Sequence, residues 1–137
     1  TQSRSSAASD VYKRQGRGEL LSKIEPLGKT VHLVLCNPQI HVSTATAYAG
    51  VQPKNSRTAL LETFKTDGVN GLQNDFEASV FESFPAIQDL KNKLYAAGAT
   101  YAAMSGSGSS VFGIFDAAPV LSADLSSQII YSGLWCY

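Results

Sequence analysis

One short segment of the sequence has the composition of a ligand-binding loop, because residues 105–109 read Ser-Gly-Ser-Gly-Ser. The glycines at 106 and 108 permit positive φ angles and close approach to the backbone, and the serines add short hydroxyl donors. Successive backbone amides in such a turn can form a concave site for an anion such as a phosphate. A plain serine-glycine hairpin turn accounts for the same composition equally well.

Two common phosphate-binding motifs do not fit this segment. A P-loop requires a lysine after its last glycine, whereas Gly108 is followed by two serines and Val111. A dinucleotide-binding GxGxxG motif requires glycine at the position of Val111 and a helix afterwards, whereas residues 111–115 have the composition of a strand. Both assignments therefore fail.

The other polar residues of interest have structural explanations. Asn74 and Asp75 precede an apolar helical pattern, and Glu77 follows Asn74 by three residues, as in a capping box. We therefore interpret this motif as a helix start, and Asp75 is not expected to be a general base. His32 and His41 lack a cysteine or carboxylate at ligand spacing, so we predict no metal site.

The apolar pattern predicts a fold in which strands and helices alternate. We expect strands at 30–36, 99–104, 110–115 and 128–135, a short helix capped by Ser43 and ended by Gly50, helices at 56–66, 74–84 and 85–97, and a small helix or turn at 122–126. Met104, Phe112, Phe115 and Trp135 lie in the strand patterns and are expected in the core. This order predicts an α+β fold, a ferredoxin-like two-layer sandwich.

Length and charge exclude several classes of protein. The chain has 137 residues, of which 44% are hydrophobic, and its 11 basic and 11 acidic side chains cancel, which fits one globular domain. Zero net charge and the lack of Lys and Arg after Lys93 argue against a nucleic-acid partner. No apolar stretch reaches membrane-spanning length, and two cysteines are too few for a disulfide scaffold, so we expect a cytoplasmic protein with no membrane partner.

The first 15 residues differ in character from the rest. They are polar and rich in serine without an apolar period, and we expect a non-native or disordered leader at 1–15 followed by one domain at 16–137.

Several motifs together carry a resemblance to a known family. The segment 98–115, which contains the glycine-rich loop, resembles the third motif of the GHMP small-molecule kinases. Further matches in the right order are Gly-Arg-Gly-Glu at 16–19, Cys-Asn-Pro at 36–38, His-Val-Ser-Thr at 41–44 and Asn-Asp-Phe-Glu at 74–77. Across about residues 16–135 the chain is most similar to the members that phosphorylate the 2-hydroxyl of diphosphocytidyl-methylerythritol for non-mevalonate isoprenoid synthesis.

The resemblance implies that the chain is the C-terminal domain of such a kinase. The family's nucleotide loop and catalytic Lys and Asp belong to an upstream domain, so the resemblance implies a missing N-terminal kinase domain as partner and no catalytic residue here. It implies ATP and Mg²⁺ as cofactors of the full-length enzyme, with neither binding tightly to this chain, which is expected to be inactive alone. Ser43 and Thr44 resemble a polar pair at the domain cleft; we expect Ser43 to cap its helix and Thr44 to contact the substrate, diphosphocytidyl-methylerythritol.

The same resemblance places Ser105, Gly106, Ser107, Gly108 and Ser109 at that cleft, where the loop would brace the missing phosphate loop. A stand-alone ferredoxin-like module that binds or senses a small molecule is the alternative, because a fold does not determine a function.

Overall fold

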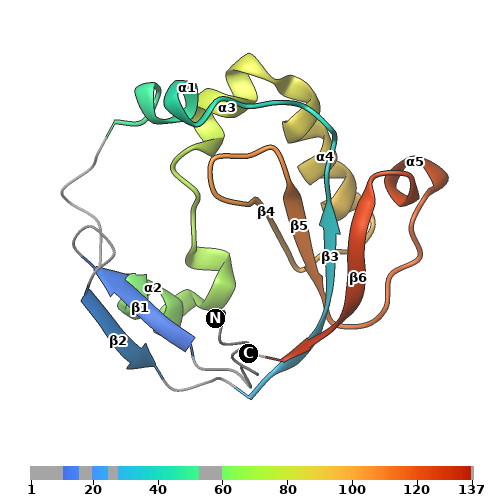
Figure 1. Cartoon of the computed structure of the whole chain (residues 1–137). Helices are drawn as coiled ribbons and strands as arrows, with labels where there is room; N and C mark the ends of the chain where they lie inside the picture. Colours follow the sequence, from blue (N-terminus) through green and yellow to red (C-terminus); the bar gives the residue numbers. More distant parts are fainter. Residues whose placement is uncertain (1–10, 16–19, 25–27, 53–59, 137) are drawn as a thin grey trace, which may run out of the picture.

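The computed structural model describes residues 11–15, 20–24, 28–52 and 60–136 (Figure 1). In chain order the elements are β1 (Val11–Gln15), β2 (Leu20–Ile24), β3 (Thr30–Cys36), α1 (Thr44–Ala49), α2 (Leu60–Asp67), the 3₁₀ helix η1 (Gly68–Gly71), α3 (Glu77–Ser83), α4 (Pro85–Ala96), β4 (Tyr101–Met104), β5 (Val111–Phe115), α5 (Ala123–Ser126) and β6 (Ile129–Cys136).

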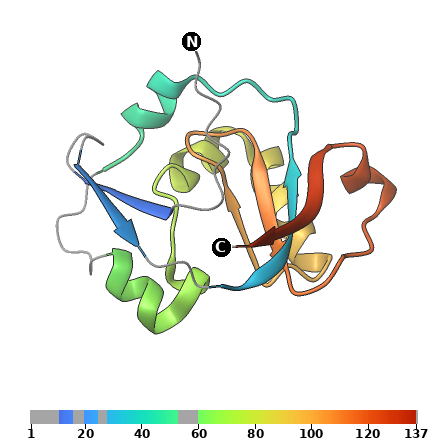
Figure 2. The same ribbon diagram turned by 60° about the horizontal axis from the view of Figure 1, so that its bottom comes forward.

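Four strands form one antiparallel sheet in the order β4-β5-β3-β6 (Figure 2). Leu33 of β3 pairs with Ile114 of β5 on one side and with Gly133 of β6 on the other. Numbered among themselves, these strands have the order 2-3-1-4. Helices lie between β3 and β4 and between β5 and β6, whereas β4 and β5 are joined directly. This arrangement confirms the predicted α+β, ferredoxin-like fold.

The main core lies between one face of the sheet and the helices α3 and α4. In α4, Pro85 stands at the first turn, where its missing N–H costs nothing, and apolar residues at helical spacing point to the sheet. Ile87, Leu90 and Leu94 are at most 2% exposed. The sheet and α3 contribute to this cluster Val34, Cys36, Ala102, Met104, Val111, Phe115, Val80 and Phe81. Met104 and Phe115 are thus core residues, as expected.

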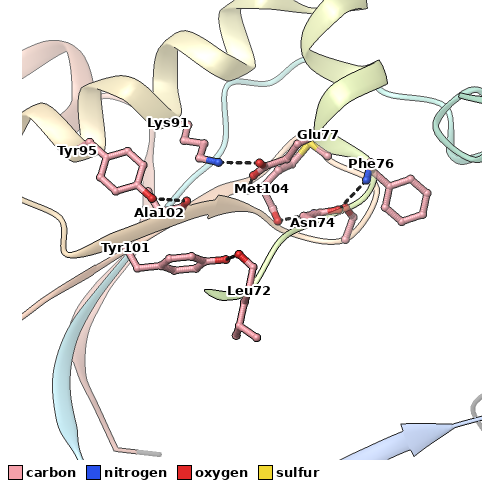
Figure 3. Close-up of polar contacts among 10 residues, drawn as sticks. Leu72, Asn74, Phe76, Glu77, Lys91, Tyr95, Tyr101, Ala102 and Met104 are labelled. Atoms are coloured by element: carbon pink, nitrogen blue, oxygen red, sulfur yellow. Dashed lines mark hydrogen bonds and ion pairs between the residues drawn. The ribbon is translucent and has the colours of Figure 1, made fainter. Parts of the chain in front are cut away.

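A smaller cluster lies on the other face of the sheet. It contains Val31, Tyr101, Ala103 and Ile114, with Val69 and Leu72 packed against it and Phe112 partly buried there. The Tyr101 hydroxyl donates a hydrogen bond to the Leu72 carbonyl at 3.2 Å, which ties the segment after η1 to the sheet (Figure 3). Burial raises the pKa of the Tyr101 hydroxyl to about 12, and the Glu77 carboxylate adds to the effect.

This raised pKa predicts an alkaline loss of stability. Because an unfolded tyrosine ionises near pH 10, the contribution of neutral Tyr101 is fully present below about pH 10 and disappears as the pH rises through about 12. Urea unfolding from pH 9 to 12 should show the free energy of unfolding of the Tyr101→Phe variant falling less than that of the unchanged chain, by on the order of 2 kcal/mol. The Tyr48→Phe variant, which changes an exposed tyrosine, should follow the unchanged chain. Identical pH dependence in all three proteins would contradict the burial argument.

Several element boundaries differ from the sequence prediction. Helix α3 begins at Glu77 rather than at Asn74, whose side-chain amide bonds the Met104 carbonyl of β4. The predicted start of the preceding helix, at Ser56, lies outside the described residues, and α2 is described from Leu60. Trp135 is 48% exposed, as are most side chains of β6, so its prediction as a core residue is wrong.

The predicted leader falls partly outside the described residues. Residues 1–10 are not described, whereas Val11–Gln15 form β1 and pair antiparallel with β2 in a separate two-stranded sheet. Residues 11–15 are thus described as a strand, and both the non-native or disordered leader at 1–15 and the domain boundary at residue 16 stay predictions.

Candidate functional site

The glycine-rich segment forms the connection between β4 and β5 (Figure 1). The Ser105 amide donates to the Ser110 carbonyl at 2.8 Å, and the Gly108 amide donates to the Ser105 carbonyl at 3.1 Å. Gly106 and Gly108 have φ angles of 55° and 95°, a region that favours glycine. The segment is therefore a hairpin connection whose shape depends on both glycines.

Asn74 holds the entrance of this loop (Figure 3). Its side-chain amide donates to the carbonyl of Met104 at 2.7 Å and to the carbonyl of Gly106 at 2.9 Å. Its Oδ1 accepts a hydrogen bond from the Phe76 amide at 3.0 Å. Asn74 thus joins the segment before α3 to the glycine-rich loop, 30 residues further along the chain.

Glu77 holds the same region from the first turn of α3. Its Oε1 accepts a hydrogen bond from the Met104 amide at 2.8 Å, and its Oε2 lies 2.6 Å from Lys91 Nζ on α4. The Lys91 ammonium also lies 5.7 Å from the centre of the Phe81 ring. The predicted capping box is therefore wrong for Glu77, whose carboxylate bonds the Met104 amide and Lys91. Asn74 does accept a hydrogen bond from the Phe76 amide near the start of the helix.

Ser43 and Thr44 directly follow Val42, which lies beside the glycine-rich loop. Ser43 is the N-cap of α1, where its Oγ accepts from the Thr46 amide at 3.5 Å, so its predicted capping role is confirmed. Thr44 is exposed at the first position of this helix. A β-carbon placed on Gly108 would lie 3.6 Å from Cγ2 of Val42, which shows how closely this segment and the loop approach. Substrate contact by Thr44 stays a prediction.

Helix α1 is fixed in turn by α3 and the residues before it. The Tyr48 and Phe76 rings meet edge to face with centres 4.8 Å apart. A β-carbon on Gly50 would lie 2.3 Å from Cβ of Ser79, so only glycine allows this approach. Three predicted segments, residues 41–44, 74–77 and 105–109, thus meet at one end of the domain, which we call the loop end.

The loop end offers backbone amides rather than cationic side chains to a ligand. Among the described residues, the amides of Gly106 and Ser107 donate to no other group, whereas Lys91 is already paired with Glu77. An anion at this end would therefore be held by backbone N–H groups.

The described ranges contain no group of three His, Cys, Asp or Glu side chains that could hold a metal ion. His32 instead bonds the Ser132 hydroxyl at 2.9 Å, and burial in the core raises the pKa of the Cys36 thiol. The residues described here do not by themselves fit a Mg²⁺ site. None of the helices described is long and apolar enough to cross a membrane.

Comparison with known proteins places the fold and the loop in one family. Residues 57–128 match the family model of the C-terminal domain of GHMP kinases. The chain therefore belongs to the GHMP kinase family, as the motifs predicted.

Curated relatives point to one branch of this family. The chain is 46% identical over 109 residues to 4-diphosphocytidyl-2-C-methyl-D-erythritol kinase of Cytophaga hutchinsonii, and 43% identical over 104 residues to the protein of that name from Bacteroides fragilis. Each match covers 74% of this chain and 38% of the relative. The chain thus matches little more than a third of the length of these relatives.

Solved structures support the fold. A crystal structure of 4-(cytidine 5'-diphospho)-2C-methyl-D-erythritol kinase matches with a TM-score of 0.66 and 23% identity, over 90% of this chain and 48% of that one. Homoserine kinase from Cytophaga hutchinsonii matches with a TM-score of 0.51 and 18% identity, over 85% and 44% of the two chains. At these identities the likeness concerns the fold alone.

Proposed function

We propose that this chain is the substrate-side C-terminal domain of an ATP-dependent kinase that phosphorylates the 2-hydroxyl of 4-diphosphocytidyl-2-C-methyl-D-erythritol in non-mevalonate isoprenoid precursor synthesis. The observation that carries the proposal is the 46% identity to a kinase named for that substrate. The loop end supports it, because the segments expected to face the substrate lie together there.

In this proposal the chain contributes positioning rather than chemistry. Phosphoryl transfer depends mainly on alignment and on neutralising charge, and ATP with Mg²⁺ supplies the phosphoryl group and part of that neutralisation when bound. The loop at 105–109 presents backbone groups at the cleft, Thr44 contacts the methylerythritol part of the substrate, and Ser43 keeps the start of α1 in place. The partner is the N-terminal kinase domain, which would supply the nucleotide loop and the catalytic Lys and Asp.

The proposal predicts that the 137-residue chain is inactive by itself. With ATP, Mg²⁺ and diphosphocytidyl-methylerythritol, we expect no phosphorylated product above a no-protein control, because the nucleotide loop and catalytic side chains are assigned to the other domain. Coupled detection of ADP and direct detection of the product by mass spectrometry check this result. Sustained turnover by the purified chain would overturn the assignment of catalysis to the partner domain.

Growth complementation tests the proposed function in cells. We define the chimera as the N-terminal part of the Cytophaga hutchinsonii kinase joined to residues 16–137 in place of its own matching part. In a strain depleted of its own diphosphocytidyl-methylerythritol kinase, the chimera should restore growth, as the intact Cytophaga kinase does, and the N-terminal part alone should not. A chimera that accumulates as folded protein without restoring growth would contradict the proposal.

A further inference from the structure

We infer that Asn74 and Glu77 are positioning residues that set the conformation of the glycine-rich loop for phosphoryl transfer. The effect on the loop follows from the contacts of these two side chains, whereas the effect on catalysis rests on the proposed function. Nothing in the motif's composition distinguished this role from helix capping.

Strand β4 is an edge strand of the sheet, and its last residue, Met104, pairs on one side with Val111 of β5. Its amide donates to Glu77 at 2.8 Å, and its carbonyl accepts from Asn74 at 2.7 Å. The two side chains thus bond the backbone groups that a neighbouring strand would otherwise pair.

Asn74 also holds the turn itself. Its side-chain amide bonds the Gly106 carbonyl as well as that of Met104, so that one side chain holds the backbone on both sides of Ser105. In a trans peptide the N–H points opposite to the carbonyl of the preceding residue. Because the Gly106 carbonyl faces Asn74, the Ser107 amide points away from it. The hydrogen bond from Asn74 therefore favours the orientation of the Gly106–Ser107 peptide in which the Ser107 amide is available to a ligand.

Glu77 is kept in place by its ion pair with Lys91 of α4. Its side chain is 16% exposed, and that of Lys91 is 21% exposed, so the pair is largely shielded from water. One carboxylate oxygen bonds Lys91 and the other bonds the Met104 amide. The ion pair between Glu77 of α3 and Lys91 of α4 therefore fixes the carboxylate that bonds the end of β4. Asn74 bonds the same strand end and the loop that follows it.

The first experiment measures the loop in the full 137-residue chain. Asn74→Asp keeps the size of the side chain but replaces the amide donor that faces two carbonyls with a carboxylate oxygen. Amide hydrogen exchange followed by NMR should show protection at Ser105 and Gly108 falling about tenfold or more, with protection in the remaining β3–β5 ladder within about twofold. The matched control is Asn92→Asp on exposed α4 surface, which adds the same charge and should leave the loop unchanged.

Unchanged protection at Ser105 and Gly108 in folded Asn74→Asp protein would overturn the inference. If that variant does not fold, Asn74→Ala is used, which removes the donor without adding a charge and is expected to raise the same two exchange rates. Uniform loss of protection across loop and ladder in the alanine variant would equally overturn the inference, because it would show a general structural role.

The second experiment measures the catalytic consequence in the chimera. Asn74→Asp should lower kcat about tenfold or more, while KM for ATP and for diphosphocytidyl-methylerythritol stays within about twofold, because misaligned reacting groups slow the chemical step. Asn92→Asp should leave kcat and both KM values unchanged. An unchanged kcat with altered loop exchange would overturn the catalytic part of the inference. An inactive chimera with the unchanged sequence would instead refute the proposed function, while the exchange result still decides the positioning role.

Discussion

Replacing Gly108 by valine is expected to lower kcat/KM of the chimera about a hundredfold. Gly108 has a φ of 95°, which a β-branched residue adopts only with strain. A β-carbon there would lie 3.0 Å from Sδ of Met104 and 3.6 Å from Val42. The Met104 backbone is held by Asn74 and Glu77, so the added bulk is expected to distort the loop and the start of α1 rather than the strand.

Gly106→Val is the matched comparison for this prediction. Gly106 also has a positive φ, but a β-carbon there meets no atom within 4 Å, so its effect should come from backbone strain alone and be smaller. Ser107→Ala, which keeps the backbone and removes one hydroxyl, should have the mildest effect. Each kcat/KM is measured per folded protein beside the melting temperature. Folded Gly108→Val enzyme with unchanged kcat/KM would mean that the segment is only a hairpin turn.

Replacing Lys91 by methionine is expected to lower the free energy of unfolding of the chain by about 2–4 kcal/mol. Methionine keeps an apolar stem of similar length beside Phe81 but leaves the Glu77 carboxylate, 16% exposed, without its cation. Removing one partner of a shielded ion pair costs more than the pair contributes, because the remaining charge is poorly solvated.

Two control variants make this stability prediction specific. Lys93→Met removes a cation that is 41% exposed and lies near Asp89 and Asp124, so its effect should be much smaller. The double variant Lys91→Met with Glu77→Gln should lose less stability than the sum of its single variants, because the stranded charge is removed. Urea unfolding followed by circular dichroism measures these four variants, Glu77→Gln included, and the unchanged chain. Equal losses for Lys91→Met and Lys93→Met would contradict the shielded-pair argument.

The periodic elements of this fold could be predicted because their signals are local. The strand at 30–36 ends directly before Asn37-Pro38, and the stripe of Ile87, Leu90 and Leu94 marks α4 from Pro85 onward. The order of these elements was enough to predict the ferredoxin-like sheet. The exposure of Trp135 was not predictable from its strand pattern, because the burial of a strand depends on the elements that pack against it: β4 and β6 are both edge strands, but only β4 is buried.

The hydrogen bonds that hold the glycine-rich loop could not be predicted, because they join residues that are distant in sequence. Asn74 and Glu77 bond a strand end about 30 residues further on, and the same spacing of residue types is typical of a local capping box. One signal was present: Lys91 lies four residues after Ile87, on the apolar side of α4. A charge at such a position usually has a shielded partner, and here that partner is Glu77.

The central claim, that this chain completes a diphosphocytidyl-methylerythritol kinase, is tested most directly by the activity of the purified chimera. Its control joins the same N-terminal part to the matching C-terminal part of the Cytophaga hutchinsonii homoserine kinase, which shares the fold. With ATP, Mg²⁺ and diphosphocytidyl-methylerythritol, we expect the chimera to reach kcat/KM within about tenfold of the intact Cytophaga enzyme, and the control to show no turnover. A folded chimera with no more activity than the control would contradict the claim.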